Sequence, residues 1–168
     1  MVARTPRESR NAPRMGIRGV SALAFPQIGH KKRIGEDRRC CMRCGYEGPC
    51  VQKDDNEIVR RTLLDTDMVV FATPLYYYGM SAQLKTVIDR FCAYNSSLNS
   101  RHLKSALLTV AWNADDRTFD ALEANYKTLV RYINFNDMGM VLGCGCGSPS
   151  MTRRSGYPEK AYQLGRKL

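Results

Sequence analysis

Residues 68–85 restrict the fold of this chain more than any other part of the sequence. They begin with an apolar run, residues 68–72, which is long enough for one strand buried on both faces. Pro74 ends that run, because proline cannot donate a backbone hydrogen bond to a strand ladder. A tyrosine-rich loop follows, and Ser81 starts a helical pattern that continues with Leu84, Val87, Ile88, Phe91 and Cys92. A buried strand that turns through a short loop into a helix is typical of a parallel α/β sheet.

The same alternation continues through the rest of the chain. Four segments have helical periodicity: residues 54–65, 81–95, 118–135 and 159–167. Asp54 and Asp55 can cap the first of these helices. Two further apolar runs predict buried strands: residues 106–111 and 138–142. Repeated βα units of this spacing predict right-handed crossovers and a parallel sheet covered by helices on both faces.

The tyrosine loop lies where such folds bind ligands. In an open α/β sheet, the loop at the carboxyl end of a strand reaches the edge where ligands bind. Tyr76, Tyr77 and Tyr78 combine flat apolar rings with polar tips, which suits a flat heterocycle. The alternative is that these tyrosines pack as core residues of an ordinary turn. Trp112 and Asn113 follow the next strand and reach the same rim, although Trp112 is equally well explained as a core residue at the sheet edge.

Residues 73–91 resemble the flavin-ring loop and following helix of the NADPH-dependent FMN reductases. That group belongs to the flavodoxin-like superfamily, which also includes the iron–sulfur flavoproteins and quinone reductases. The resemblance implies α/β architecture as a flavodoxin-like three-layer sandwich, with a parallel sheet of order 2-1-3-4-5. The segments above supply strands 3, 4 and 5. The implied flavin-ring residues are Pro74, Leu75, Tyr76, Tyr77, Tyr78 and Gly79, with Trp112 and Asn113 flanking the ring.

The first forty residues match the family pattern poorly. Thr5, Arg7 and Asn11 resemble the loop that binds the FMN phosphate after the first strand. Prolines and glycines interrupt the segment between Asn11 and Gly29, where a helix is expected. Too few residues precede Thr5 for a central strand. We therefore expect strands 1 and 2 to be missing or degraded, and phosphate anchoring to be weakened or lost.

Positive charge is concentrated in the same segment. The net charge is +10, of which residues 1–39 carry +7 (ten Lys/Arg minus three Asp/Glu) and residues 40–168 carry +3. We therefore distinguish a basic, atypical and partly disordered segment, 1–39, from a flavodoxin-like domain, 40–168, in a chain of one domain overall. A basic arm can bind nucleic acid or acidic lipid. These basic residues form no helical stripe and no aromatic interleaving, so we expect no nucleic-acid partner.

The sequence contains no apolar run near the length of a membrane span and no signal peptide, so we expect no membrane association. The seven cysteines, an odd number, favour a reducing cytoplasm. Cys40, Cys41, Cys44 and Cys50 resemble the cysteine loop that carries a cluster in iron–sulfur flavoproteins. Position 47 is Glu47 where that loop has a further cysteine, so we expect a redox-sensitive thiol loop without an iron–sulfur cluster or other metal. Cys144 and Cys146 are expected to be structural.

The resemblance implies an enzyme whose chemistry belongs to FMN rather than to a catalytic side chain. Hydride would pass from NAD(P)H through FMN to a quinone, flavin or similar small-molecule acceptor. Relatives are commonly dimers, which implies a homodimer here. Two alternatives remain open: a flavodoxin-type electron carrier, and a flavin-free remnant with a damaged phosphate-binding loop.

Overall fold

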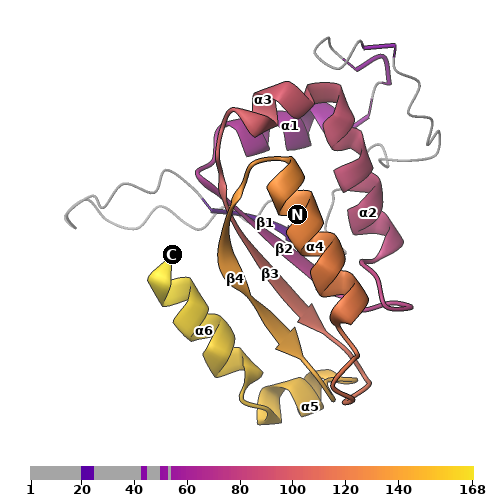
Figure 1. Ribbon diagram of the computed structural model, residues 1–168, viewed down its shortest axis with the longest axis vertical. Helices are drawn as coiled ribbons and strands as arrows, with labels where there is room; N and C mark the ends of the chain where they lie inside the picture. Colours follow the sequence, from indigo (N-terminus) through magenta and orange to yellow (C-terminus); the bar gives the residue numbers. More distant parts are fainter. Residues whose placement is uncertain (1–19, 25–42, 45–49, 53) are drawn as a thin grey trace.

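The computed structural model describes residues 20–24, 43–44, 50–52 and 54–168. Among these residues, four parallel strands form one sheet in the order β1-β2-β3-β4 (Figure 1). The strands are β1 (Val20–Ala24), β2 (Met68–Pro74), β3 (Lys104–Val110) and β4 (Asn136–Gly143). Within the ladder, Ala24 lies opposite Ala72, and Pro74 lies opposite Val110. The loops after β2, β3 and β4 therefore leave from one edge of the sheet.

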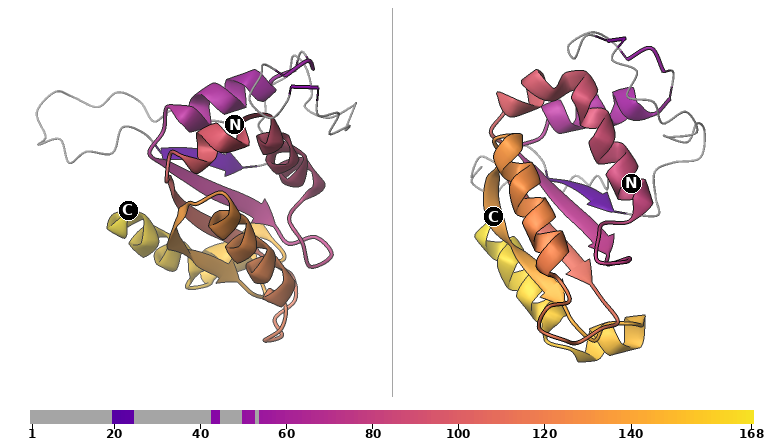
Figure 2. Two further views of the ribbon diagram at one scale, coloured as in Figure 1. Left: turned by 45° about the horizontal axis from the view of Figure 1, so that its top comes forward. Right: turned by 45° about the vertical axis from the view of Figure 1, so that its right-hand side comes forward.

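Helices connect these strands and cover both faces of the sheet. They are α1 (Asn56–Leu64), α2 (Ala82–Asp89), the 3-10 helix η1 (Arg90–Tyr94), α3 (Asn95–Asn99), α4 (Asp120–Tyr132), α5 (Pro149–Arg154) and α6 (Tyr157–Lys167). Right-handed crossovers in a strand order that never reverses place the connecting helices on one face. The α6 helix follows the last strand and packs against β4 from the other side (Figure 2). In the described part of the chain, no helix is both long and apolar enough to cross a membrane.

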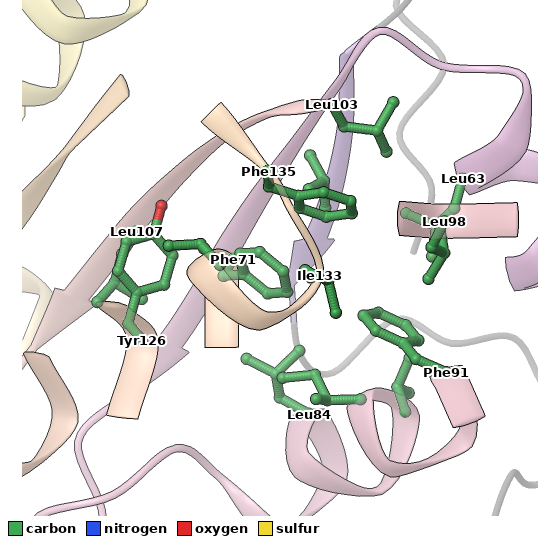
Figure 3. Packing of buried hydrophobic residues seen from close by; sticks show 14 of the residues in the cluster. Leu63, Phe71, Leu84, Phe91, Leu98, Leu103, Leu107, Tyr126, Ile133 and Phe135 are labelled. Atoms are coloured by element: carbon green, nitrogen blue, oxygen red, sulfur yellow. The ribbon is translucent and has the colours of Figure 1, made fainter. Parts of the chain in front are cut away.

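The main core lies between the sheet and helices α1, α2 and α4. Phe71 from β2, Leu107 from β3 and Tyr126 from α4 are completely buried there (Figure 3). The Tyr126 hydroxyl lies 3.0 Å from Ser105 Oγ and donates to Asp137 Oδ1 at 3.1 Å. Burial raises the pKa of Tyr126, so its hydroxyl stays neutral and keeps this donor. The core is therefore largely apolar, and the hydroxyls of Tyr126 and Ser105 within it are paired with each other.

The opposite face of the sheet is covered less completely. Side chains alternate along a strand, so the residues next to Phe71 and Leu107 point away from the main core. A hollow of about 320 Å³ lies on that face, between β2, β3 and the helices α5 and α6. Its wall includes Ala72, Leu108 and Val110 from the strands, with Tyr157 and Ala161 from α6. The α6 helix contributes no fully buried residue.

Most predicted elements are confirmed with boundaries shifted by a few residues. One difference is the helix expected over residues 81–95, which forms α2, tightens into η1 and resumes as α3. A second is α5, which the sequence analysis did not predict. The sequence does contain a signal for α5: a serine followed by a proline, which are favoured at the N-cap and in the first turn of a helix. In the structure, Ser148 accepts a hydrogen bond from Met151 N at 3.3 Å and Pro149 occupies the first turn.

The strand β1 corrects the expectation that strand 1 is missing or degraded. It is parallel to β2 over five residue pairs, Val20 to Ala24 opposite Met68 to Ala72. The observed order therefore reproduces the 1-3-4-5 part of the predicted order. No counterpart of strand 2 occurs among the residues that the structure describes. Because β1 lies within residues 1–39, part of that segment joins the sheet.

An ion-paired glutamate lies in the first turn of α1. Glu57 Oε1 accepts hydrogen bonds from Arg60 Nη2 at 2.7 Å and from Arg61 Nε at 3.0 Å. Its hydrogen bond with Arg60 is the largest influence and lowers the pKa of Glu57 from 4.5 to about 2. A carboxyl whose pKa is lower in the folded state stabilises the fold above its unfolded pKa. That contribution disappears as the pH falls from 4.5 towards 2.

We expect Glu57→Gln to lower the free energy of unfolding by no more than about 0.5 kcal/mol near neutral pH, because exposed ion pairs contribute little. The Glu57 side chain is 42% exposed, which keeps the effect small. Near pH 2, Glu57 is about half protonated in the folded protein and almost fully protonated in the unfolded chain, so most of this contribution is lost and the variant and the parent should unfold at nearly the same urea concentration. Urea unfolding at both pH values measures this. A difference that persists unchanged at the acid limit would contradict the assignment.

Candidate functional site

A tight hairpin forms the centre of the rim at the carboxyl ends of β2 and β3. Tyr76 N donates to Gly79 O at 3.1 Å, and Gly79 N donates to Tyr76 O at 3.0 Å. Tyr77 and Tyr78 occupy the two positions between them, with φ of 47° and 63°. Positive φ at both central residues is the signature of a type I′ turn. We call residues 76–79 the tyrosine hairpin.

Both ends of the tyrosine hairpin are attached to the sheet and to α2. Before it, Leu75 N donates to Val110 O in β3 at 2.9 Å. After it, the buried Ser81 donates its N–H to Thr73 Oγ1 at 3.0 Å, which closes the loop on the end of β2. The Ser81 hydroxyl then accepts from Leu84 N at 3.3 Å and caps α2. The hairpin therefore stands on a fixed base.

The tyrosine side chains of the hairpin are exposed, so they are not core residues. The exposed fractions are 59% for Tyr76, 103% for Tyr77 and 54% for Tyr78. No hydrogen bond joins the backbone N–H groups of Tyr77, Tyr78 or Met80 to another described residue. Aromatic faces and free backbone donors thus lie together on one short loop. This excludes the alternative in which the tyrosines pack inside an ordinary turn.

The backbone of the tyrosine hairpin is strained. Left-handed φ values cost about 1–2 kcal/mol for a residue with a side chain, whereas glycine adopts them freely. Here two tyrosines occupy such positions in succession. Strain of this kind is concentrated at binding sites, where the surrounding structure holds the residue in place. The fixed base described above supplies that support.

Trp112 and Asn113 follow β3 on the same rim, and their loop is joined to the loop after β4. Gly145 N donates to Asn113 O at 2.9 Å, and Cys146 N donates to Ala111 O at 2.7 Å. The Trp112 side chain is 72% exposed. It is therefore a rim residue and not a core residue at the sheet edge. In the loop after β4, Cys146 is buried and Cys144 is half-buried, each as a free thiol.

The cysteine loop meets the main domain at a buried arginine. Arg90 Nη2 donates to Cys50 Sγ at 3.0 Å, and Arg90 Nη1 donates to Asp54 Oδ2 at 2.6 Å. Cys44 is half-buried against the core. Cys40 and Cys41 lie outside the described residues, and no group of three or more metal-ligating side chains occurs among those described. The sequence analysis missed Arg90, because its partners lie 36 and 40 residues away along the chain.

The structure describes the predicted flavin-ring residues but not the predicted phosphate ligands. Pro74 and Leu75 lead into the tyrosine hairpin, and Trp112 and Asn113 occupy the neighbouring loop of the same rim. The three residues predicted to bind phosphate lie outside the described residues: Thr5, Arg7 and Asn11. The sequence analysis also missed the closure of the loop by Thr73 and Ser81. Their side chains were readable as a β-strand end and a helix cap, but not as partners of each other.

Comparison with known proteins agrees with this geometry. A family model described as "Flavodoxin-like fold" matches residues 32–166 of the chain. The iron-sulfur flavoprotein MJ0731 of Methanocaldococcus jannaschii is 31% identical over 113 residues, which are 64% of this chain and 56% of that protein. The chain spans between 24% and 56% of the length of the three curated iron-sulfur flavoproteins that it matches.

Solved structures share the fold. The NAD(P)H:quinone oxidoreductase from Methanothermobacter marburgensis has a TM-score of 0.58 and 17% identity, covering 72% of this chain and 65% of that one. The general stress protein 14 from Treponema denticola, solved in complex with FMN, has a TM-score of 0.53 and 15% identity, covering 69% of this chain and 75% of that one. The resemblance drawn from residues 73–91 is confirmed, and the chain belongs to the flavodoxin-like family.

Proposed function

We propose that this protein is an FMN-dependent NAD(P)H oxidoreductase that reduces a quinone, a flavin or a similar small acceptor. The observation that carries the proposal is the strained tyrosine hairpin, which holds three exposed aromatic side chains at the carboxyl edge of a parallel sheet. The names of an NAD(P)H:quinone oxidoreductase and of an FMN complex among proteins of this fold support the same reading. That the protein forms a homodimer in the cytoplasm stays a prediction.

The rim fits the ring of FMN. An isoalloxazine has two flat apolar faces and an edge of hydrogen-bond acceptors. The tyrosine hairpin offers aromatic side chains for the faces and the backbone N–H groups of Tyr77, Tyr78 and Met80 for the edge. Trp112 supplies a further exposed ring on the neighbouring loop. The proposed phosphate ligands are Thr5, Arg7 and Asn11, on the resemblance alone.

When bound, FMN would supply the redox chemistry that connects NAD(P)H with the acceptor. The residues of this chain bind and orient the reactants. The exposed rings of the tyrosine hairpin hold flat molecules by stacking. The hydrogen bond between Thr73 and Ser81 fixes the position of the hairpin relative to the end of β2. No side chain of the rim is required to act as an acid or a nucleophile.

The decisive experiment is to titrate the purified full chain with FMN and then mix the complex with NADPH in a stopped-flow instrument. Saturable FMN binding followed by rapid bleaching of the flavin, with reoxidation by a para-quinone, supports the proposal. Bound FMN that NADPH reduces only slowly would instead indicate an electron carrier. Absence of FMN binding would overturn the proposal in favour of a flavin-free remnant.

The Tyr77→Gly substitution is expected to have opposite effects on the stability of the protein and on its affinity for FMN. Tyr77 is fully exposed and makes no packing contact to lose, whereas its φ of 47° favours glycine. Relief of about 1–2 kcal/mol of strain exceeds the extra chain entropy of glycine, so we expect Tyr77→Gly to gain about 0.5 kcal/mol of stability. Loss of one stacking ring should weaken FMN binding by about two- to tenfold.

Urea unfolding and FMN titration of the same variant test this trade-off. Tyr162→Ala is the matched control, because Tyr162 is 62% exposed on α6, away from the rim, and its loss should leave FMN affinity unchanged. If Tyr77→Gly lowers stability and keeps full FMN affinity, the strain does not serve binding and the role assigned to the hairpin is wrong.

A further inference from the structure

Gly147 lies directly against the ring of Trp112. A Cβ atom built on Gly147 would lie 1.8 Å from Trp112 Cε3 and 2.5 Å from both Cδ2 and Cζ3. All three atoms belong to the six-membered ring of the indole. No side chain larger than hydrogen fits at position 147 while the indole keeps its place, because carbon atoms in contact lie about 3.5–4.0 Å apart. The indole ring of Trp112 therefore packs directly on the backbone of Gly147.

Hydrogen bonds hold the backbone on both sides of Gly147, so a side chain at this position would displace the indole ring of Trp112. Before Gly147, the buried Cys146 donates its N–H to Ala111 O at 2.7 Å. After it, Ser148 accepts from Met151 N at 3.3 Å as the cap of α5. The loops that carry Trp112 and Gly147 are further joined by Ala111 N, which donates to Gly143 O at 2.8 Å. Trp112 itself is 72% exposed and has room to swing away.

Glycine is required at position 147 because of the contact with Trp112 and not because of its backbone dihedral angles. Gly145, two residues earlier, has a φ of +63°, where any side chain strains the chain. Gly147 does not have a positive φ of this kind, so alanine can adopt its backbone conformation. A methyl group at position 147 thus acts on Trp112 without distorting the loop by itself.

We propose that Gly147 is a positioning residue, which sets the orientation of the Trp112 ring as an aromatic platform for a flat aromatic ligand on this rim. One part of the indole rests on Gly147, and the remainder is open to solvent for stacking. The proposal rests on the proposed function for the identity of that ligand, the flavin or a quinone acceptor. It assigns a binding role to the turn after β4, which carries Cys144 and Cys146, two residues expected from the sequence to be structural.

The test uses Gly147→Ala in the full chain, with Gly156→Ala as the control, because a Cβ at Gly156 meets nothing within 4 Å. Trp112 is the single tryptophan of the chain, so intrinsic fluorescence reports its ring alone. We expect Gly147→Ala to change the emission and the acrylamide quenching of the ligand-free protein. We also expect it to raise the FMN Kd or the KM for a para-quinone by about two- to tenfold, the value of one aromatic contact.

A double-mutant cycle distinguishes positioning from general damage to the loop. In a Trp112→Ala background, Gly147→Ala should have no further effect on FMN Kd or quinone KM, because the ring it displaces is gone. If Gly147→Ala alone does not fold, rescue of folding by Trp112→Ala supports the collision, and failure of rescue overturns it. An equal loss of affinity in both backgrounds, or an unchanged Trp112 emission, also overturns the proposal.

These outcomes are separable from those of the proposed function. A protein that binds no FMN would refute the oxidoreductase proposal. The fluorescence of the ligand-free Gly147→Ala variant would still measure whether Gly147 sets the position of Trp112.

Discussion

An Arg90→Ala variant is expected to lose about 3 kcal/mol of its free energy of unfolding, the usual result of leaving a buried charge without its partner. The side chains of Arg90 and Asp54 are 10% and 12% exposed, and their Nη1 and Oδ2 atoms are 2.6 Å apart. Burial alone would lower the pKa of Arg90, but the hydrogen bonds that Arg90 donates to Asp54 and Cys50 raise it, so the guanidinium remains charged. Removing it leaves the Asp54 carboxylate buried with Asn56 N as a remaining donor, at 3.0 Å.

Urea unfolding measures this loss, and the chain contains a matched control. Arg117 Nε lies 3.5 Å from Asp120 Oδ2, but those side chains are 86% and 63% exposed. Arg117→Ala should therefore change the free energy of unfolding by less than about 0.5 kcal/mol. The double variant Asp54→Asn, Arg90→Met should recover much of the loss, because no unpaired charge remains. Equal effects of Arg90→Ala and Arg117→Ala would show that burial does not strengthen the Arg90 interaction.

The Arg90 interaction joins elements that lead to the candidate site, but Arg90 itself is not part of the rim. Arg90 begins η1, directly after α2, and α2 itself starts at the cap formed by Ser81 next to the tyrosine hairpin. Through Cys50 and Asp54, Arg90 joins the cysteine loop and α1 to that helix. We expect FMN affinity of Arg90→Ala to be normal at temperatures where the variant is folded, because no atom of Arg90 belongs to the rim.

A Phe71→Ala variant is expected to lose about 4 kcal/mol, since a large aromatic side chain is removed from a closely packed core. Phe71 has no exposed surface and lies in β2, which pairs with strands on both sides. Its ring meets the ring of Tyr126 edge to face, with centroids 5.9 Å apart and an interplanar angle of 73°. The lost free energy combines the transfer of the ring from water with the cavity left behind.

Circular dichroism during urea unfolding is the suitable measurement, because Trp112 is exposed on the rim and its fluorescence does not report the core. Phe71→Leu is the control. It keeps most of the apolar volume and should cost about 1 kcal/mol. A loss below about 1.5 kcal/mol for Phe71→Ala would mean that the surrounding side chains collapse into the space, which contradicts the close packing expected of this core.

The sequence predicted helices and strands well where the spacing of apolar residues matches the face that the element buries. The apolar run at residues 68–72 became β2, and the helical pattern at residues 118–135 became α4. The tightening of the helix over residues 81–95 at Arg90 was not predictable, because its periodicity is unbroken. Arg90 turns inward there to reach Asp54 and Cys50, and that requirement lies outside the local sequence.

The candidate site was predicted in its chemistry and not in its geometry. Three adjacent tyrosines after a strand indicated a flat ligand, and the structure places all three on the rim. Their left-handed backbone could not be foreseen, because tyrosine disfavours positive φ and Tyr77 and Tyr78 adopt it under tertiary constraint. The strand β1 was also missed, since five residues among prolines and basic side chains do not form a distinctive strand pattern.

From β2 onward, the sequence by itself determined the order of strands and helices, apart from α5 and the division of the helix over residues 81–95. It also determined the aromatic character of the loop after β2. Both are properties of neighbouring residues, whose periodicity and turn chemistry act locally. Only the tertiary structure decided that Arg90 meets Cys50, that Thr73 closes the loop on Ser81, and that Gly147 lies against Trp112. The physical reason is that these contacts join residues that lie apart along the chain, so they depend on how the elements pack. For Gly147 and Trp112, the register of β3 and β4 brings their two loops together at one edge of the sheet and leaves space there for a glycine alone.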